Sequence, residues 1–166
     1  MNLGFFSNSG KSPYNKILLK CPCNTAGLKN LNLVVSQLMA FSKTGFNVII
    51  EESTGSSPAI SFPDSIIVSK KLLEQPISVI AFVMAHEWGH QMFGHTTIPP
   101  YLRPTSGKQF DEDSADSYAA RFYTAHEYNL GDVYQFNALF FPEEAQLRNE
   151  KIALSAYWHI SASPVC

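Results

Sequence analysis

Apolar residues recur at helical spacing in the first long segment of the chain. From Asn24 onward, the side chains that share one apolar face are Leu28, Leu31, Val35 and Leu38. Intervals of three and four residues bring side chains to one face of a helix with 3.6 residues per turn. We therefore expect a helix that begins near Asn24 or Thr25, either of which can cap it, and that ends before Gly45.

Two short segments after that helix have the pattern of strands. Phe46, Val48 and Ile50 alternate with other residues, which places them on one face of an extended chain. A run of Ser, Thr, Gly and Pro over residues 53–58 marks a turn region. The run Ile66–Val68 then predicts a second short strand.

An apolar helix is expected to follow Pro76 and to include a histidine-rich segment. Proline suits the first turn of a helix, because the N–H that it lacks would have no partner there. The sequence ISVIAFVMAHEWGHQMFGH contains no helix-breaking residue before Gly89 and Gly94. Its first half is apolar on nearly every side, which is typical of a helix buried at the centre of a domain.

The last third of the chain is also expected to be helical. After a proline-rich loop, a helix is predicted with Asp111 as its cap and Gly131 at its end. Its inward side chains are Ala115, Ala119 and Phe122. Residues 1–23 are rich in Ser, Asn, Gly and Pro, and we expect an irregular leader there. Residues 24–166 predict one α+β domain, with a small sheet packed on the central helix and further helices around it.

Composition narrows the classes of function. The net charge is −2, so no basic field exists to attract nucleic acid or anionic lipid. The longest apolar run, Val79–Ala85, is far shorter than the ~20 residues that span a membrane, and the first residues lack the apolar core of a signal peptide. We therefore expect a soluble, cytoplasmic chain without a transmembrane segment and without nucleic-acid binding.

The cysteines are an odd set without a C-x-x-C pair: Cys21, Cys23 and Cys166. Such a set is a poor disulfide framework and does not suggest a zinc ribbon. We expect ordinary thiols, although a bridge from Cys166 to one of the other two stays open.

The segment HEWGH has the arrangement of a metal site. Successive helical residues differ in direction by about 100°, so His86 and His90 lie one turn apart on the same face, where their imidazoles can converge on one ion. Glu87 projects beside them and can reach a metal-activated water without being a ligand. This is the H-E-x-x-H arrangement of zinc peptidases. Exposed histidines on an amphipathic helix are the alternative, which fits poorly because the preceding turns are apolar.

Two histidines need a third ligand, for which there are two candidates. His95 would point about 180° away from His86 if the helix continued, so we expect a surface residue or an outer contact of the site. Glu112 and Asp116 lie four residues apart on one face of the next predicted helix, and small Ala115 permits close packing. We expect Glu112 to be the third ligand and Asp116 to accept the free N–H of a ligating histidine.

The acidic run at residues 111–113 has a simpler explanation as well. Acidic side chains are favoured in the first turn of a helix because they interact with its dipole. That explanation does not account for the inward pair of Ala115 and Asp116, so the ligand role of Glu112 is the favoured one.

HEWGH followed by EDSAD resembles the H-E-x-x-H … E-x-x-A-D signature of the gluzincin zinc metallopeptidases. The similarity extends over roughly residues 58–125 to the HtpX and CAAX-prenyl-protease family, whose H-E-x-G-H glycine matches Gly89. Members of that family usually carry transmembrane helices or a signal peptide, which this sequence does not show. The chain therefore resembles a soluble relative near the minimal core of the family.

The resemblance implies a zincin-like fold for residues 24–166 and one Zn²⁺ ion. It implies that the metal ligands are His86, His90 and Glu112. Glu87 is then the general base and Asp116 the partner of a ligating histidine. It further implies that Ile66–Val68 is an edge strand, along which an extended polypeptide substrate pairs by backbone hydrogen bonds.

These expectations amount to a zinc-dependent endopeptidase that hydrolyses peptide bonds through a metal-activated water, with Glu87 as the base. The alternative is a non-hydrolytic module on the same scaffold that binds a peptide or a partner protein. Glu87 argues against that alternative, since a structural zinc site needs no base. The residue that stabilises the oxyanion stays open among Tyr118, Tyr123, Tyr157 and His159. A cysteine thiolate that blocks the zinc in a latent form is a further hypothesis.

Overall fold

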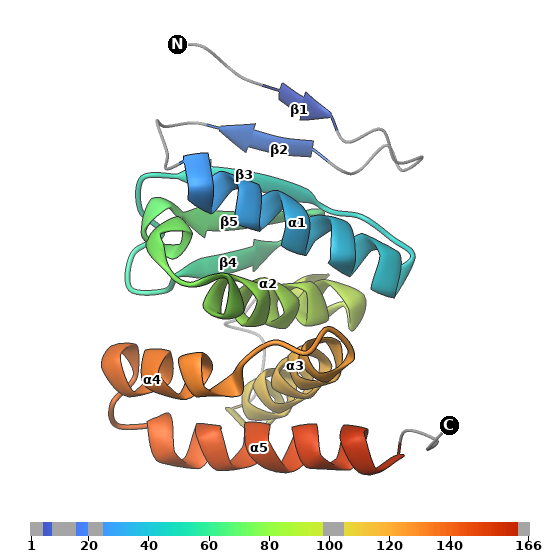
Figure 1. Cartoon of the computed structure of the whole chain (residues 1–166), viewed down its shortest axis with the longest axis vertical. Helices are drawn as coiled ribbons and strands as arrows, with labels where there is room; N and C mark the ends of the chain where they lie inside the picture. Colours follow the sequence, from blue (N-terminus) through green and yellow to red (C-terminus); the bar gives the residue numbers. More distant parts are fainter. Residues whose placement is uncertain (1–4, 8–15, 20–24, 98–104, 163–166) are drawn as a thin grey trace.

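The structure of the protein is a computed structural model that describes residues 5–7, 16–19, 25–97 and 105–162 (Figure 1). The strands are β1 (Phe5–Ser7), β2 (Lys16–Leu19), β3 (Asn47–Glu51), β4 (Ala59–Phe62) and β5 (Ser65–Ser69). The helices are α1 (Thr25–Ser42), α2 (Ile77–Met92), α3 (Thr105–Ala125), α4 (Leu130–Phe140) and α5 (Ala145–Ala162), with short 3₁₀ turns η1 (Lys70–Glu74) and η2 (His95–Thr97). This combination is an α+β architecture, as the sequence predicts.

The sheet and the helices occupy different parts of the molecule. The described strands form one mixed sheet in the order β1-β2-β3-β5-β4, in which β2, β3 and β5 are parallel and the two outer strands antiparallel. Helix α1 lies against the sheet, α2 lies between the sheet and the lower helices, and α3, α4 and α5 form the lower part in Figure 1. In β3 and β5 every second residue is buried, at Val48, Ile50, Ile66 and Val68. The alternation predicted from the sequence is therefore present.

The expected edge strand at Ile66–Val68 is wrong. β5 is paired on both sides, with β3 in parallel and with β4 antiparallel, so its backbone groups are already used. The outer strand on this side is β4, which reverses into β5 through Pro63 and Asp64, the latter in the left-handed conformation (φ 63°). The sequence pattern does not predict this strand, because AISF is short and follows a turn-rich segment.

The irregular leader expected over residues 1–23 is wrong for the part that the structure describes. Phe5–Ser7 and Lys16–Leu19 form β1 and β2, and Leu18 of β2 aligns with Ile49 of β3. A short strand is stabilised mainly by its neighbours in the sheet, which the surrounding polar residues of this segment do not reveal.

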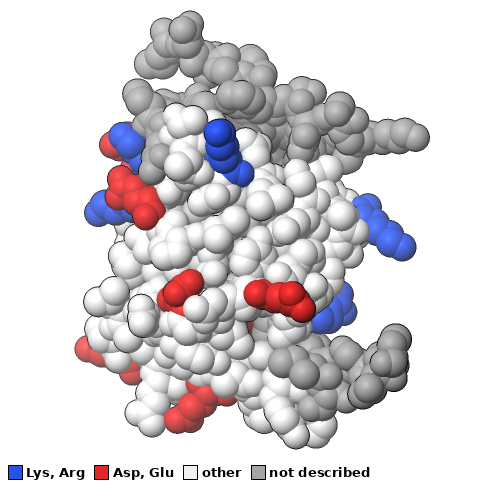
Figure 2. Space-filling model, viewed as in Figure 1, with Lys and Arg blue, Asp and Glu red and all other residues white. Residues whose placement is uncertain are grey.

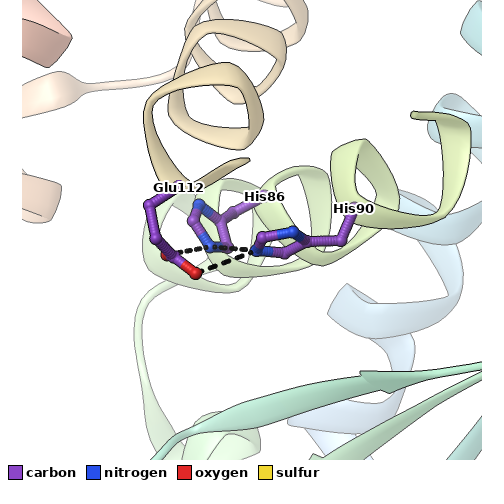
Figure 3. Close-up of side chains that lie close together, drawn as sticks. All are labelled: His86, His90 and Glu112. Atoms are coloured by element: carbon purple, nitrogen blue, oxygen red, sulfur yellow. Dashed lines mark hydrogen bonds and ion pairs between the residues drawn. The ribbon is translucent and has the colours of Figure 1, made fainter. Parts of the chain in front are cut away.

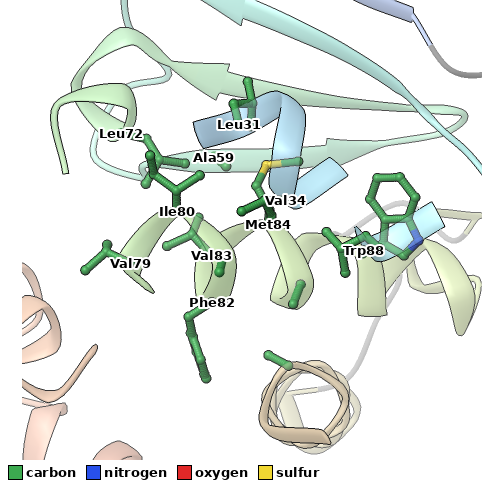
Figure 4. Packing of buried hydrophobic residues seen from close by; sticks show 14 of the residues in the cluster. Leu31, Val34, Ala59, Leu72, Val79, Ile80, Phe82, Val83, Met84 and Trp88 are labelled. Carbon is green, nitrogen blue, oxygen red and sulfur yellow. The ribbon is translucent and has the colours of Figure 1, made fainter. Parts of the chain in front are cut away.

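Helix α2 is buried on nearly all sides, as its apolar sequence predicts. Ile80 and Met84 point toward the sheet and α1, whereas Phe82 points to the opposite side (Figure 4). There the Phe82 ring packs against Tyr123 of α3, with the ring centroids 5.8 Å apart. Two polar residues of the helix, His86 and Glu87, are therefore buried among packed apolar side chains.

Two predicted helix boundaries in the last third are wrong. Asp111 does not cap α3, because the helix begins at Thr105 and Gly107 does not interrupt it. Gly131 does not end α3 either. The helix stops at Ala125, and Gly131 lies in the first turn of α4, where its N–H donates to the side chain of Asn129. A single glycine weakens a helix by about 1 kcal/mol, which tertiary packing readily exceeds.

Charged side chains are sparse on one face of the molecule. On the face drawn in Figure 2, uncharged residues make up most of the described surface, with acidic and basic side chains interspersed. In the part of the chain that the structure describes, none of the helices has the length and apolar character needed to cross a membrane.

The packing of α1 on η1 leads to a stability prediction. A Cβ atom at Gly27 would lie 2.1 Å from the backbone oxygen of Leu73. We expect Gly27→Ala to lower the free energy of unfolding by about 1–3 kcal/mol, although alanine by itself favours a helix. Chemical denaturation measures the change, with the exposed Lys29→Ala in the same turn as the control. Equal or greater stability of the Gly27 variant would contradict this packing.

Candidate metal centre

Three side chains from two helices converge on one point. His86 and His90 lie one turn apart on α2, with their Nε2 atoms 3.1 Å from each other. Glu112 reaches them from α3, and its two carboxylate oxygens lie 3.2 Å from Nε2 of His86 and 3.4 Å from Nε2 of His90 (Figure 3). This group can hold a metal ion.

The separations within this group fit a small tetrahedral ion. Ligand atoms bound at about 2.0–2.1 Å around such an ion stand roughly 3.3 Å from one another. The 3.1 Å between the two Nε2 atoms and the 3.2 Å from Oε2 of Glu112 to Nε2 of His86 lie close to that value, and one ligand atom of each residue lies within 4.8 Å of the others. A small rotation of the Glu112 carboxylate would let all three side chains bind one ion.

A close approach of two helices brings Glu112 to the histidines. Gly89, one turn from His86 on α2, faces α3, and a Cβ atom there would lie 3.1 Å from Cα of Ala115 and from Cβ of Tyr118. The lack of a side chain at Gly89 and the small one at Ala115 let the helix backbones come near each other. Glu112, one turn before Ala115, then reaches across to the two imidazoles.

Behind His86 stands an ion pair that fixes the orientation of its ring. Nδ1 of His86 lies 2.7 Å from Oδ1 of Asp116. Arg148 from α5 donates to both oxygens of the same carboxylate, at 3.0 and 3.1 Å. A carboxylate here keeps a proton on Nδ1 of His86 and orients the ring so that Nε2 faces Glu112 and His90. Nothing in the sequence indicated Arg148, which lies 32 residues after Asp116.

The charges of this cluster shift its pKa values. Burial lowers the pKa of His86, but the carboxylates of Asp116, Glu112 and Glu87 outweigh it and raise that pKa to about 10. Burial by itself would raise the pKa values of Asp116 and Glu112. The interaction with His86 lowers the pKa of both carboxylates below the usual range, and Arg148 lowers that of Asp116 further. Both carboxylates therefore stay ionised. A metal ion at Nε2 of His86 must displace a proton, so metal binding there releases a proton.

Glu87 lies beside the cluster and is held by the outer strand. Its side chain is buried and lines the same cleft as the two histidines. The hydroxyl of Ser61 in β4 donates to Oε2 of Glu87 at 2.6 Å, so the other oxygen, Oε1, stays available as an acceptor. Sequence patterns gave no sign of Ser61, since serines abound in this segment.

His95 is an outer contact of the site. Helix α2 ends at Met92, and Gly94 adopts the left-handed conformation (φ 68°), which turns the chain back toward the histidines. Nδ1 of His95 lies 2.9 Å from Nδ1 of His90. The extrapolation of a continuous helix, which pointed His95 away, fails because the helix ends before it. The alternative of a surface residue is wrong, since only 9% of the side chain is exposed.

The cluster opens into a cleft of about 810 Å³. One wall is the outer strand β4, and the opposite wall carries side chains of α3, including Lys108 and Glu112. Apolar residues of the helices that line it are Val79, Phe82 and Val83 from α2 and Val133 and Phe136 from α4, and Phe141 lines it after α4. A cleft of this size, largely lined by apolar residues beside a polar cluster, is typical of a binding site for a molecule larger than the cluster itself.

No protein-family model matches the chain, and comparisons with curated proteins and with solved structures found no match. The proposal of a function therefore rests on the side chains of the site alone.

The three tyrosine candidates for stabilising an oxyanion are not brought to the cluster. Tyr123 donates its hydroxyl to the backbone oxygen of Asn129, and Tyr118 packs between Phe41 and Phe93. Tyr157 lies exposed on α5. The structure does not describe the side chain of His159. The hypothesis of a blocking thiolate concerns Cys21, Cys23 and Cys166, which lie outside the described residues.

The geometry predicts how the metal is lost. Glu112→Ala removes one of the three groups that could hold a metal ion, and its side chain is 51% exposed, so the fold is expected to persist. We expect zinc affinity to fall by at least about tenfold, measured by competition with a chelator. Asp113→Asn is the matched control, because this neighbouring carboxylate bonds Lys151 instead. Equal zinc affinity of the Glu112 variant and the wild type would show that Glu112 is not a ligand.

Proposed function

We propose that the chain is a zinc-dependent endopeptidase of the gluzincin type, with a zincin-like fold over residues 24–166. The observation that supports it best is the position of Glu87 beside the convergent His86, His90 and Glu112, inside an extended cleft. A site with only a structural role would need the three ligand groups but not a buried carboxylate next to them.

The donor set supports zinc as the metal. Two imidazole nitrogens and one carboxylate are ligands that zinc commonly has in hydrolytic enzymes, and three protein ligands leave a coordination position open. Bound zinc supplies Lewis acidity, which lowers the pKa of water and polarises a carbonyl. His86, His90 and Glu112 would hold the ion.

Glu87 acts as the general base. Ser61 holds Oε2 of Glu87 by a hydrogen bond of 2.6 Å, which limits the rotation of the carboxylate. Oε1 then accepts a proton from the attacking water and passes it to the leaving amine. The backbone oxygen of Glu87 also lies 2.9 Å from the hydroxyl of Ser61, so β4 and α2 are tied together at the reacting atoms.

The substrate is an extended polypeptide. β4 is the outer strand of the described sheet, and Ala59–Phe62 line the cleft next to the metal cluster. An extended peptide can pair with the outer edge of such a strand by backbone hydrogen bonds. This pairing positions a peptide bond near the cluster without regard to its side chains, while the apolar wall selects among them.

Replacement of the base separates metal binding from catalysis. We expect Glu87→Gln to keep about one zinc per chain but to lower the kcat/KM of peptide cleavage by about 10²–10⁴-fold, because the amide cannot accept the proton. Metal analysis and digestion of a peptide library measure the two effects. Glu150→Gln, an exposed residue of α5, is the control for purification and metal content. Equal cleavage by the Glu87 variant and the wild type would rule out this mechanism.

The same digest decides against the alternative function. Cleavage that stops with a chelator and returns with zinc is expected of a metallopeptidase. A wild-type chain that binds zinc and cleaves none of the library would instead favour a peptide-binding module on the same scaffold.

The apolar wall predicts a preference among substrates. A leucine or phenylalanine next to the scissile bond can be buried against Phe82, Val83 and Phe136, which is favourable by about 1.5–3 kcal/mol. Peptides with such a residue should be cleaved with a kcat/KM roughly 10- to 100-fold higher than matched peptides with aspartate. Kinetics on such peptide pairs measure the ratio, and a ratio near one would show that the wall does not contact the substrate.

A further inference from the structure

A third histidine connects a ligand of the cluster to the neighbouring helix. Nδ1 of His90 lies 2.9 Å from Nδ1 of His95. On its other side, Nε2 of His95 lies 3.3 Å from Oδ1 of Asp111, in α3. Asp111 directly precedes Glu112, so the same turn of α3 supplies a ligand group and the end of this hydrogen-bonded chain.

The proton positions in this chain follow from the geometry. If Nε2 of His90 binds a metal ion, the ring proton of His90 must lie on Nδ1. That N–H faces Nδ1 of His95, which must therefore accept it and carry no proton itself. The proton of His95 then lies on Nε2 and is directed at the carboxylate of Asp111. In this arrangement Nδ1 of His90 and Nε2 of His95 donate, and Nδ1 of His95 accepts.

The local structure holds His95 in this position. The positive φ of Gly94 turns the chain back after α2, as only glycine does without strain. The ring of Phe93 stacks on the His95 ring at a centroid distance of 5.5 Å and an interplanar angle of 29°. These contacts bury and orient the imidazole.

We propose that His95 is a positioning residue that fixes the tautomer and the ring orientation of His90 and so raises the zinc affinity of the site. The inference rests on the proposed zinc site. On the other side of the cluster, Asp116 makes the equivalent contact with His86, and Arg148 holds Asp116 as Asp111 holds His95. Each of the two imidazoles is thus supported by a pair of residues. Asp116 contacts the ring of His86, and His95 contacts the ring of His90.

Two nearly isosteric substitutions test the role of the accepting atom. The side-chain oxygen of asparagine can take the place of Nδ1 of His95, whereas leucine has a similar shape and no acceptor. We expect His95→Leu to lower zinc affinity by about 10- to 100-fold and His95→Asn by less than about tenfold. Competition with a chelator measures both. His126→Leu is the control, because this histidine bonds the backbone of Phe122 away from the cleft.

A measurement on the wild type avoids any effect of the substitutions on folding. In the zinc-saturated protein, the ¹⁵N chemical shifts of His95 should show the proton on Nε2 and a bare Nδ1. A proton on Nδ1, an unchanged affinity of His95→Leu, or equal losses in the leucine and asparagine variants would overturn the inference.

Zinc affinity is measured apart from cleavage, which separates this inference from the proposed function. A wild-type chain that binds zinc with the expected tautomer but cleaves no peptide would contradict the protease and support the role of His95. A wild-type chain that binds no zinc would overturn both.

Discussion

The close contact between α2 and α3 at Gly89 and Ala115 is the constraint on which the site depends. The two helices can approach because Gly89 has no side chain and Ala115 a small one. Only at this separation does Glu112 reach across to His86 and His90. A larger residue at Gly89 would push the helices apart and remove the third ligand group without touching any of the three residues that form it.

The same contact determines which residues surround the cluster. Asp111 directly precedes Glu112 on α3 and Asp116 lies one turn after it, and each supports one imidazole, through His95 or directly. Arg148 reaches Asp116 from α5, which packs on α3. Side chains from α3, η2 and α5 thus set the orientation of the histidines. The packing of the lower helices therefore affects how well the two imidazoles are placed to bind a metal ion.

The cleft combines two features that have separate origins. The polar cluster belongs to α2 and α3, whereas the rest of the lining comes from β4, from α4 and the turn after it, and from apolar residues of α2. Ser61 joins these parts, because it belongs to the strand and bonds the carboxylate of Glu87. The proposed hydrolysis uses this arrangement: a peptide aligned on β4 lies beside the base that the same strand holds.

Local sequence determined the elements whose pattern is strong, and tertiary packing decided the rest. The apolar spacing of α1, the alternation in β3, the apolar run of α2 and the four-residue spacing of the histidines in HEWGH are all local features, because a helix or strand repeats them within a few residues. The strands β1, β2 and β4 are too short for a pattern, and their pairing with neighbours makes them strands. The true edge strand, the return of His95 to His90, and the contacts of Ser61 and Arg148 depend on where the chain turns and which helices pack together. These residues are between 5 and 32 positions away from the groups they bond. Spacing along a sequence describes neighbours within one element, and only the folded chain brings separate elements to the same point.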